Sequence, residues 1–313
     1  MMSKSVLALL LCLSSSAAFM PSVRQSVMRS KGQASSQTVR TATASFNGAD
    51  YKSLLTSNRA KVDSLASVAP DIPEITRLRF ALAFPDQAEA ESNLKDTIAW
   101  REGAGRSIVE SAAAAVAKAT ENGGWDNEAV ANAAPNAATI NEFITSKSIL
   151  TLSTEAGDLL YVIRASGIDD KAMMNKVPVP QLVDFFLYVK EVHSLVANAR
   201  SERTGRLCGV VFANDIKGTR NIPDKRFSEA LTSSSQQYEK LYPAMAGQTM
   251  ILNLPFILQA FVGLFKPLFP KSVQERLVFT SAPVLAKLSE LTPLTTDAST
   301  RKAFDAEITK LLR

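Results

Sequence analysis

The chain has 313 residues, 46% of them hydrophobic, and its 35 basic and 30 acidic residues give a formal net charge of +5. Five of the basic residues and none of the acidic ones precede Asp50, so the rest of the chain has thirty of each sign. The excess positive charge therefore belongs to the N-terminal segment, which removes the case for a nucleic-acid-binding protein.

The first 46 residues have the pattern of a two-part targeting leader. Residues 1–18 contain Lys4, an apolar run and a small-residue exit, which predict a secretory signal peptide whose core is too short to span a bilayer. Residues 19–46 are rich in Ser and Thr and contain basic but no acidic residues, which is typical of an organelle transit peptide. With Phe19 at the junction, this leader resembles the bipartite plastid leaders of algae with red-lineage plastids. We therefore expect a plastid (chloroplast) protein, soluble or peripheral on a membrane; secretion with a disordered N-terminus is the alternative.

A small helical lobe is predicted over residues 47–135. Apolar residues recur at helical spacing over 51–68, and the Ala-rich segment 107–120 has a strong helix propensity. Between them, Asp86 is expected to cap the start of a helix that Gly103 ends. The Gly-Ala-Gly sequence at Gly103 begins like a dinucleotide-binding loop, but it follows a helix and lacks the last glycine of that motif. We interpret it as a helix terminator.

Between residues 136 and 295 the pattern changes to strands that alternate with helices. The predicted strands cover 158–166, 206–215, 249–254 and 276–281, and the predicted helices cover 180–200, 224–241 and 256–269. This alternation predicts an α/β sheet covered by helices. One further helix is expected at the C-terminus, over 296–313.

The chain has one histidine, and only one cysteine outside the predicted signal peptide. A single cysteine forms no internal disulfide and leaves a thiolate metal site short of ligands. Cys208 lies in a predicted strand and is interpreted as a small core residue. His193 shares its helical spacing with apolar residues, so we expect a core histidine that is hydrogen-bonded to the backbone; a polar group facing a ligand is the alternative.

Residues 248–270 carry a single charge and raise the question of a membrane span. A span needs about 20 unbroken apolar residues, whereas Asn253 and Pro255 interrupt this run. The pattern instead predicts a buried strand over 249–254 and a helix over 256–269. Because that helix is apolar on nearly every side, we expect it to cover a pocket on one side or to contact a membrane on the other.

Three short motifs follow one another at characteristic distances: Tyr-Pro at 242–243, Asn-Leu-Pro at 253–255 and Phe-Lys-Pro-Leu at 265–268. They resemble the signature of the CRAL-TRIO lipid-binding family, which includes the phosphatidylinositol- and tocopherol-transfer proteins. The resemblance extends over about residues 71–289. It implies a CRAL-TRIO-like α/β domain at 136–295, in which a sheet covered by helices forms a hydrophobic pocket, preceded by the helical lobe.

The resemblance also implies a lipid site that a mobile gate helix closes, here the helix over 256–269. The expected pocket residues are Phe212, Met250, Leu252, Phe256, Leu258, Phe261 and Phe265. The residues expected to contact a membrane are Leu264, Phe265, Leu268 and Phe269, and those expected to contact a lipid headgroup are Tyr242, Lys266 and Arg276. No catalytic residue, metal ligand or cofactor other than the bound lipid is expected.

The sequence departs from the family pattern beside the Tyr-Pro motif. Ala244 and Met245 stand where phosphatidylinositol-binding members usually have Glu and Arg, and Arg276 retains one positive group. This departure favours a less polar cargo, which in a plastid would be tocopherol or a related quinone, a carotenoid, or a glycerolipid.

We therefore predict non-enzymatic binding and transfer of a hydrophobic lipid between plastid membranes, by a monomer that contacts membranes peripherally and binds no nucleic acid. The alternative is a membrane- or protein-docking adaptor that keeps the fold but carries no ligand. An enzyme acting on lipids is a third possibility, for which the sequence offers no identifiable nucleophile–base pair.

Overall fold

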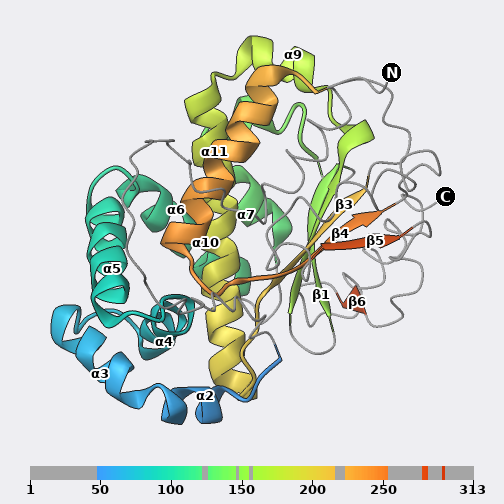
Figure 1. The fold of residues 1–313 in the computed structure, drawn as a ribbon. Coiled ribbons are helices and arrows are strands. Elements are labelled where there is room, and N and C mark those ends of the chain that lie inside the picture. The colour runs from blue at the N-terminus through green and yellow to red at the C-terminus, as the bar shows by residue number, and fades with distance from the viewer. Residues whose placement is uncertain are drawn as a thin grey trace, which may run out of the picture.

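The computed structural model describes residues 48–121, 126–145, 148–154, 158–215, 223–252, 277–280 and 291–292 (Figure 1). The predicted leader, the predicted gate helix over 256–269 and the predicted C-terminal helix over 296–313 lie outside these residues. Within the described part, no helix is both long and apolar enough to cross a membrane.

The N-terminal part of the described chain is helical. Its helices are α2 (Tyr51–Ser57), α3 (Arg59–Val68), α4 (Glu74–Ala83), α5 (Gln87–Glu102), α6 (Arg106–Thr120), α7 (Asn127–Asn132) and α8 (Ala137–Ile140). Asp86 caps α5, since its carboxylate accepts a hydrogen bond from the Glu89 amide at 2.9 Å, and Gly103 ends the same helix, both as the sequence predicts. A separate core that includes Val62, Leu65 and Leu78 holds α2 to α5 together, whereas buried residues of α6 and α8 belong to the core around α10.

The rest of the described chain alternates strands and helices. Its strands are β1 (Ile149–Thr154), β2 (Leu159–Arg164), β3 (Val210–Asp215), β4 (Ala246–Leu252), β5 (Leu277–Thr280) and β6 (Leu291–Thr292), and its helices are α9 (Asp170–Lys176), α10 (Val179–Thr204) and α11 (Lys225–Leu241). The sheet has the order β5-β4-β3-β2-β1-β6. The strands β2 to β5 are parallel, while β1 runs antiparallel to both of its neighbours. The fold is α/β with a helical N-terminal region, consistent with the CRAL-TRIO-like class that the sequence predicts.

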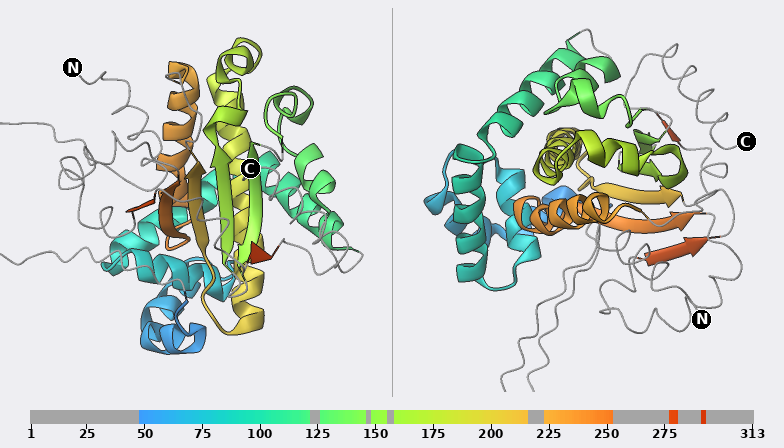
Figure 2. Two further views of the ribbon diagram at one scale, coloured as in Figure 1. Left: turned by 90° about the vertical axis from the view of Figure 1, so that its right-hand side faces the viewer. Right: turned by 90° about the horizontal axis from the view of Figure 1, so that it is seen from above.

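The strands, the two long helices and the helical lobe lie in successive layers. Seen from above, α10 and α11 separate the lobe from the strands (Figure 2). The odd-numbered residues of β2, such as Tyr161, face this helical layer and share one core with α6, α10 and α11 residues such as Phe186 and Phe227. Side chains alternate between the faces of a strand, so the even-numbered residues of β2 belong to the opposite face.

The α10 helix packs against both α6 and α11. It begins after the N-cap Pro178, has Pro180 in its first turn, where a missing N–H costs no intrahelical hydrogen bond, and runs for 26 residues. It ends at Gly205, whose φ of +70° is the left-handed conformation that glycine adopts most easily at a helix end. Thirteen of its residues are buried, including the polar Lys190, Glu191 and His193.

Candidate functional site

The sheet has a second face, defined by Leu160, Val162 and Arg164 of β2 and Val211, Ala213 and Asp215 of β3. Leu160, Val162 and Ala213 are 1%, 3% and 0% exposed, yet none of them belongs to the two cores built by the described helices. The described helices lie on the other side of the sheet (Figure 1). The second face is therefore an apolar floor that the helical layer does not cover.

An ion pair lies at one end of this floor. Arg164 and Asp215 are register partners at the carboxyl ends of β2 and β3, and Arg164 Nε donates to the Asp215 carboxylate at 3.2 Å. Asp215 is 2% exposed, whereas the Arg164 side chain is 21% exposed. Ligands of open α/β sheets usually bind at the carboxyl ends of the strands. An apolar floor that ends in a charged pair suits a ligand with a long apolar part and a small polar head.

The strand register locates three of the predicted pocket residues. In the backbone register, Met250 pairs with Ala213 and Leu252 pairs with Asp215. Phe212 pairs with Thr249 on the helix side of the sheet, where its ring lies 6.1 Å from Tyr161 and 5.9 Å from Tyr238. Phe212 therefore lies in the helix-side core, because adjacent strand residues such as Phe212 and Ala213 point to opposite sides of a sheet.

Most of the other predicted site residues fall outside the described residues. These are Phe256, Leu258, Phe261, Leu264, Phe265, Lys266, Leu268, Phe269 and Arg276. Tyr242 is described, and it lies not on the second face but in the helix-side core, with its ring 5.6 Å from that of Tyr238. Tyr242 therefore lies on the side of the sheet that faces α10 and α11, and its predicted headgroup contact stays a prediction.

His193 and Cys208 are both core residues, as the sequence predicts. Cys208 is buried and unpaired, and His193 is 2% exposed. The partner of the histidine differs from the expected backbone group: its Nε2 lies 2.9 Å from Thr151 Oγ1, and its ring lies edge-on to Tyr161. Burial lowers the pKa of His193 to about 3, and the neighbouring Lys190 charge adds to this effect, so the ring is neutral at ordinary pH.

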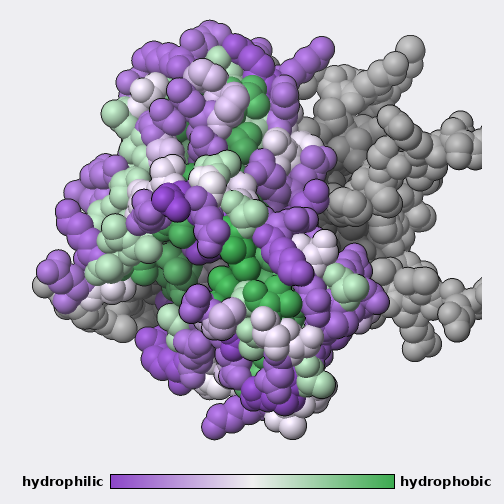
Figure 3. All heavy atoms as spheres, turned by 90° about the vertical axis from the view of Figure 1, so that its left-hand side faces the viewer, coloured by the Kyte–Doolittle hydropathy of each residue, from purple (hydrophilic) through white to green (hydrophobic). Residues whose placement is uncertain are grey.

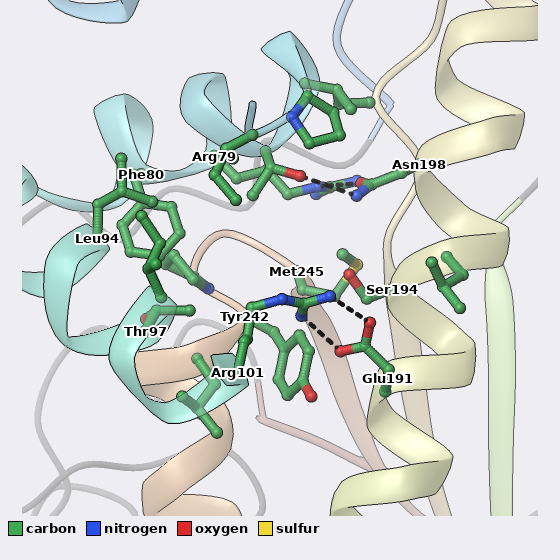
Figure 4. Close-up of a pocket in the computed structure, with 18 of the residues that line it drawn as sticks. Arg79, Phe80, Leu94, Thr97, Arg101, Glu191, Ser194, Asn198, Tyr242 and Met245 are labelled. Atoms are coloured by element: carbon green, nitrogen blue, oxygen red, sulfur yellow. Dashed lines mark hydrogen bonds and ion pairs between the residues drawn. The ribbon is translucent and has the colours of Figure 1, made fainter. Parts of the chain in front are cut away.

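A separate cavity of about 250 Å³ lies between the helical lobe and the sheet domain (Figure 4), which we call the interlobe cavity. Its walls come from α4, α5, α10 and the turn between α11 and β4. The apolar wall residues include Ile75, Phe80, Leu94, Ile98, Leu195 and Met245, and the exposed Pro73, Ala199 and Glu202 stand at its rim. Apolar side chains gather in the middle of the face on the side of the lobe, within polar surroundings (Figure 3).

Arg79 is the most deeply buried charge on this cavity. Its guanidinium donates to Asn198 Oδ1 at 2.7 Å, to the Ala244 carbonyl at 2.7 Å and to the Cys208 carbonyl at 2.6 Å. It is 2% exposed, and no carboxylate of the described residues forms a salt bridge with it. Burial lowers the pKa of Arg79 to about 10, which still leaves it charged at neutral pH. Ala244, one of its acceptors, holds the left-handed φ of +51° that non-glycine residues seldom adopt.

Arg101 and Glu191 form a second polar pair across the cavity. Each of two Arg101 nitrogens lies 2.8 Å from a different oxygen of Glu191, and the Glu191 side chain is 1% exposed (Figure 4). Burial lowers the pKa of Arg101, but the hydrogen bonds and the charge of Glu191 outweigh it and leave the pKa raised. Burial, and then the charge of Glu191, raise the pKa of Tyr242 well above its usual value, so this hydroxyl stays protonated.

The sequence analysis did not find the interlobe cavity. Its polar residues Arg79, Arg101 and Glu191 lie on three different helices, and the apolar periodicity of each helix does not indicate that they meet. One signal was available: Arg79 interrupts the run of Leu78, Phe80 and Ala81, all of which are buried. A charge inside an apolar helical run indicates a buried group with dedicated partners.

The described residues contain no group of three or more His, Cys, Asp and Glu side chains arranged to hold a metal ion.

The sequence and the structure were compared with family models, curated proteins and solved structures. Residues 145–295 match the family model of the CRAL/TRIO domain. No curated protein matches the chain. Among solved structures, the chain is similar to the one described as the crystal structure of Sfh5, with 14% identity, a TM-score of 0.47 and coverage of 77% of this chain and 79% of that one.

The family match is the comparison that bears on function. It supports the resemblance that the sequence analysis gives over about residues 71–289, of which the family model covers the part from residue 145 onward. Domains of the CRAL/TRIO kind generally bind and transfer hydrophobic lipids and are not enzymes. Lipid binding is thus supported in general terms.

Proposed function

We propose that this protein binds one hydrophobic lipid on the second face of its sheet and transfers it between membranes without a catalytic step. The observation that carries the proposal is the apolar floor of Leu160, Val162 and Ala213, which lies within residues 145–295 and outside the cores of the described helices. A buried apolar surface of this kind suits an acyl or isoprenoid chain.

The free energy of apolar burial is sufficient for such a carrier. Each CH₂ group that leaves water gains about 0.8 kcal/mol, so a chain of sixteen carbons gains on the order of 12 kcal/mol before the costs of binding. The remaining surplus favours an enclosed lipid over one released to water. Transfer then requires only that the lipid site opens while the protein is in contact with a membrane.

The proposed gate is the apolar helix over 256–269. Its inner side would complete the pocket. Its outer side would contact the bilayer during exchange, through Leu264, Phe265, Leu268 and Phe269.

The proposed cargo is a lipid of low polarity, such as tocopherol or a related quinone, a carotenoid or a glycerolipid. Ala244 and Met245 at the Tyr-Pro motif support this choice, as does the floor among the described residues, which is apolar apart from the ion pair of Arg164 and Asp215. The leader pattern supports action at plastid membranes.

Two adjacent residues of β2 provide a matched test of the binding face. Val162 belongs to the second face and Ile163 to the helix-side core, and both are buried. We expect Val162→Phe to reduce the amount of co-purifying or added lipid per folded protein, because its ring occupies space on the floor. Ile163→Phe should leave lipid binding per folded protein unchanged, although it overpacks the core and costs about 1–3 kcal/mol of stability. Native mass spectrometry after incubation with a plastid lipid extract measures both variants, and equal lipid content in the two would refute the proposed face.

The same spectra separate a carrier from an adaptor. A defined lipid in stoichiometric amount on the wild-type chain agrees with the carrier, whereas a clean ligand-free mass after exposure to the whole extract indicates an adaptor. Vesicle-to-vesicle transfer then tests the gate: Phe265→Asp should slow transfer while Phe265→Leu preserves it. Undiminished transfer by the aspartate variant would mean that this helix does not contact the membrane.

A further inference from the structure

The interlobe cavity is distinct from the proposed lipid site. Its walls come from α4, α5, α10 and the turn before β4, on the helical side of the sheet, whereas the lipid floor is the second face. The two sites therefore share no lining residue among those described. A ligand of the interlobe cavity would therefore be distinct from the lipid proposed to bind on the second face.

The deep part of the cavity combines an apolar surface with the charges of Arg79, Arg101 and Glu191, an excess of one positive charge, while the acidic Glu202 stands at the exposed rim. Arg101 and Glu191 compensate each other through their two hydrogen bonds. Among the described residues, no carboxylate forms an ion pair with Arg79, whose three acceptors are an amide and two carbonyls. A guanidinium has five N–H groups, so these three bonds leave two for a further acceptor. A buried cation in this position favours an anion, since a carboxylate would supply the missing opposite charge.

The volume of the cavity limits the size of the ligand. A protein cavity of about 150 Å³ is known to accept benzene, with six heavy atoms. At the same packing, 250 Å³ holds roughly ten heavy atoms. This is too small for a membrane phospholipid and matches a short aliphatic acid. The polar groups lie deep and the rim at Ala199 and Glu202 is exposed, so a small ligand has a route of entry.

We propose that the interlobe cavity binds a small amphipathic anion, an aliphatic carboxylate of about ten heavy atoms. Its carboxylate accepts hydrogen bonds from Arg79, and its chain packs on Ile75, Phe80, Leu94 and Met245. Because the ligand contacts both the helical lobe and α10, it links the two parts, and the free energy of unfolding rises with the logarithm of the ligand concentration once this exceeds the dissociation constant.

Isothermal titration of the full-length chain with octanoate, which has ten heavy atoms, tests the proposal. We expect octanoate to bind, octanol to bind at least tenfold more weakly and octylammonium to bind not at all, because the latter two lack the negative charge. Absence of octanoate binding, or equal binding of octanol, would overturn the proposal.

Two variants assign the binding to this cavity. Ser194 lines the cavity from α10 (Figure 4) and Ala199 stands at its exposed rim. Ser194→Phe and Ala199→Trp should each weaken octanoate binding at least tenfold by filling the space. Gln181→Phe, on the exposed side of the same helix, is the matched control and should bind as the wild type does.

Two further readouts keep the outcome clear. Thermal unfolding of each variant shows that it is folded, and Ala199→Trp changes an exposed position, so it remains informative if Ser194→Phe does not fold. Octanoate binding that persists in both folded variants would place the acid elsewhere and overturn the proposal. The amount of long-chain lipid bound should not change in these variants. The amount of bound long-chain lipid is expected to fall in Val162→Phe instead. The proposal for the interlobe cavity and the proposal for the lipid site on the sheet can therefore be refuted independently.

Discussion

Lys190 is a buried cation in the middle of α10. It is 8% exposed, its Nζ donates to Ser234 Oγ at 3.1 Å, and it lies 5.3 Å from the centroid of the Tyr238 ring. Burial lowers the pKa of Lys190 to about 7, while the charge of Glu239 opposes this shift. In the unfolded chain a lysine has a pKa of about 10.4. The unfolded state therefore binds a proton more tightly than the folded state does.

We predict that Lys190→Met stabilises the protein by about 1–3 kcal/mol at pH 6, because it removes the cost of burying the charge. Ser234 keeps its hydrogen bond to the Leu231 carbonyl. The sign of the pH dependence follows from the lowered pKa: the destabilisation is complete below pH 7 and disappears as pH rises towards 10.4. The stability gain of the variant should therefore shrink over this window. Urea unfolding at pH 6, 8 and 10 measures it, with the exposed Lys95→Met as the control; a gain that is independent of pH would contradict the prediction.

Single residues were predictable from the sequence where their surroundings are local. His193 and Cys208 were correctly assigned to the core because helical spacing and strand position decide burial. The side of the sheet on which Phe212 lies was not predictable, because the face of a strand residue depends on its register with its neighbours. Arg79 and Glu191 were missed because their partners lie far away in the sequence, at Asn198 and Cys208 for the arginine and at Arg101 for the glutamate.

At the scale of elements, the turn between α5 and α6 explains a sequence feature that resembled a nucleotide-binding loop. Gly103 ends α5, and the Gly105 amide donates to the Trp100 carbonyl at 2.7 Å. A Cβ atom on Gly105 would lie 2.5 Å from the carbons of the Trp100 indole ring. The second glycine is thus required by the close approach of the tryptophan ring.

We predict that Gly105→Ala destabilises the protein by about 1–3 kcal/mol, because the methyl group displaces the indole ring. Ala104→Ser, at the exposed neighbouring position, is the control and should have little effect. Chemical unfolding followed by tryptophan fluorescence measures the loss and also detects the changed surroundings of the ring. Wild-type stability in Gly105→Ala would show that the ring moves aside without cost.

The strands and long helices were predictable to within a few residues. The predicted strands at 158–166 and 206–215 contain β2 and β3, and the predicted helices contain most of α10 and α11. These elements have strong apolar runs and clear end signals. The sequence analysis did not find β1 and β6: β1 is half polar in sequence, and β6 has two residues that are defined by pairing with β1. Their structure depends on tertiary contacts.

At the scale of the whole molecule, two arginines are prominent among the polar connections between the helical lobe and the sheet domain, which also include backbone hydrogen bonds of residues 48–51 to residues 205–207. Arg79 extends from α4 to α10, to the strand-side carbonyl of Cys208 and to the turn that contains Ala244. Arg101 extends from α5 to Glu191 on α10. The order of elements predicted a helical N-terminal region followed by an α/β sheet. It did not predict that the two would meet around a cavity lined by Arg79 and Arg101. This arrangement makes the docking of the lobe depend on a few hydrogen bonds.

We predict that Arg79→Met loosens the lobe and lowers the free energy of unfolding by about 2–4 kcal/mol. The substitution removes a buried charge, but it leaves three buried or half-buried acceptors without their donor, and unpaired acceptors cost about 1–3 kcal/mol each. Hydrogen exchange should increase over α2 to α5, whereas β2, β3 and α10 keep their protection because their core does not include Arg79. The matched control is Arg59→Met on the same lobe, where the pair with Glu74 is exposed and should be dispensable. Equal loss of protection in the lobe and the sheet would mean that the two parts unfold as one unit and that Arg79 does not act as a connection between them.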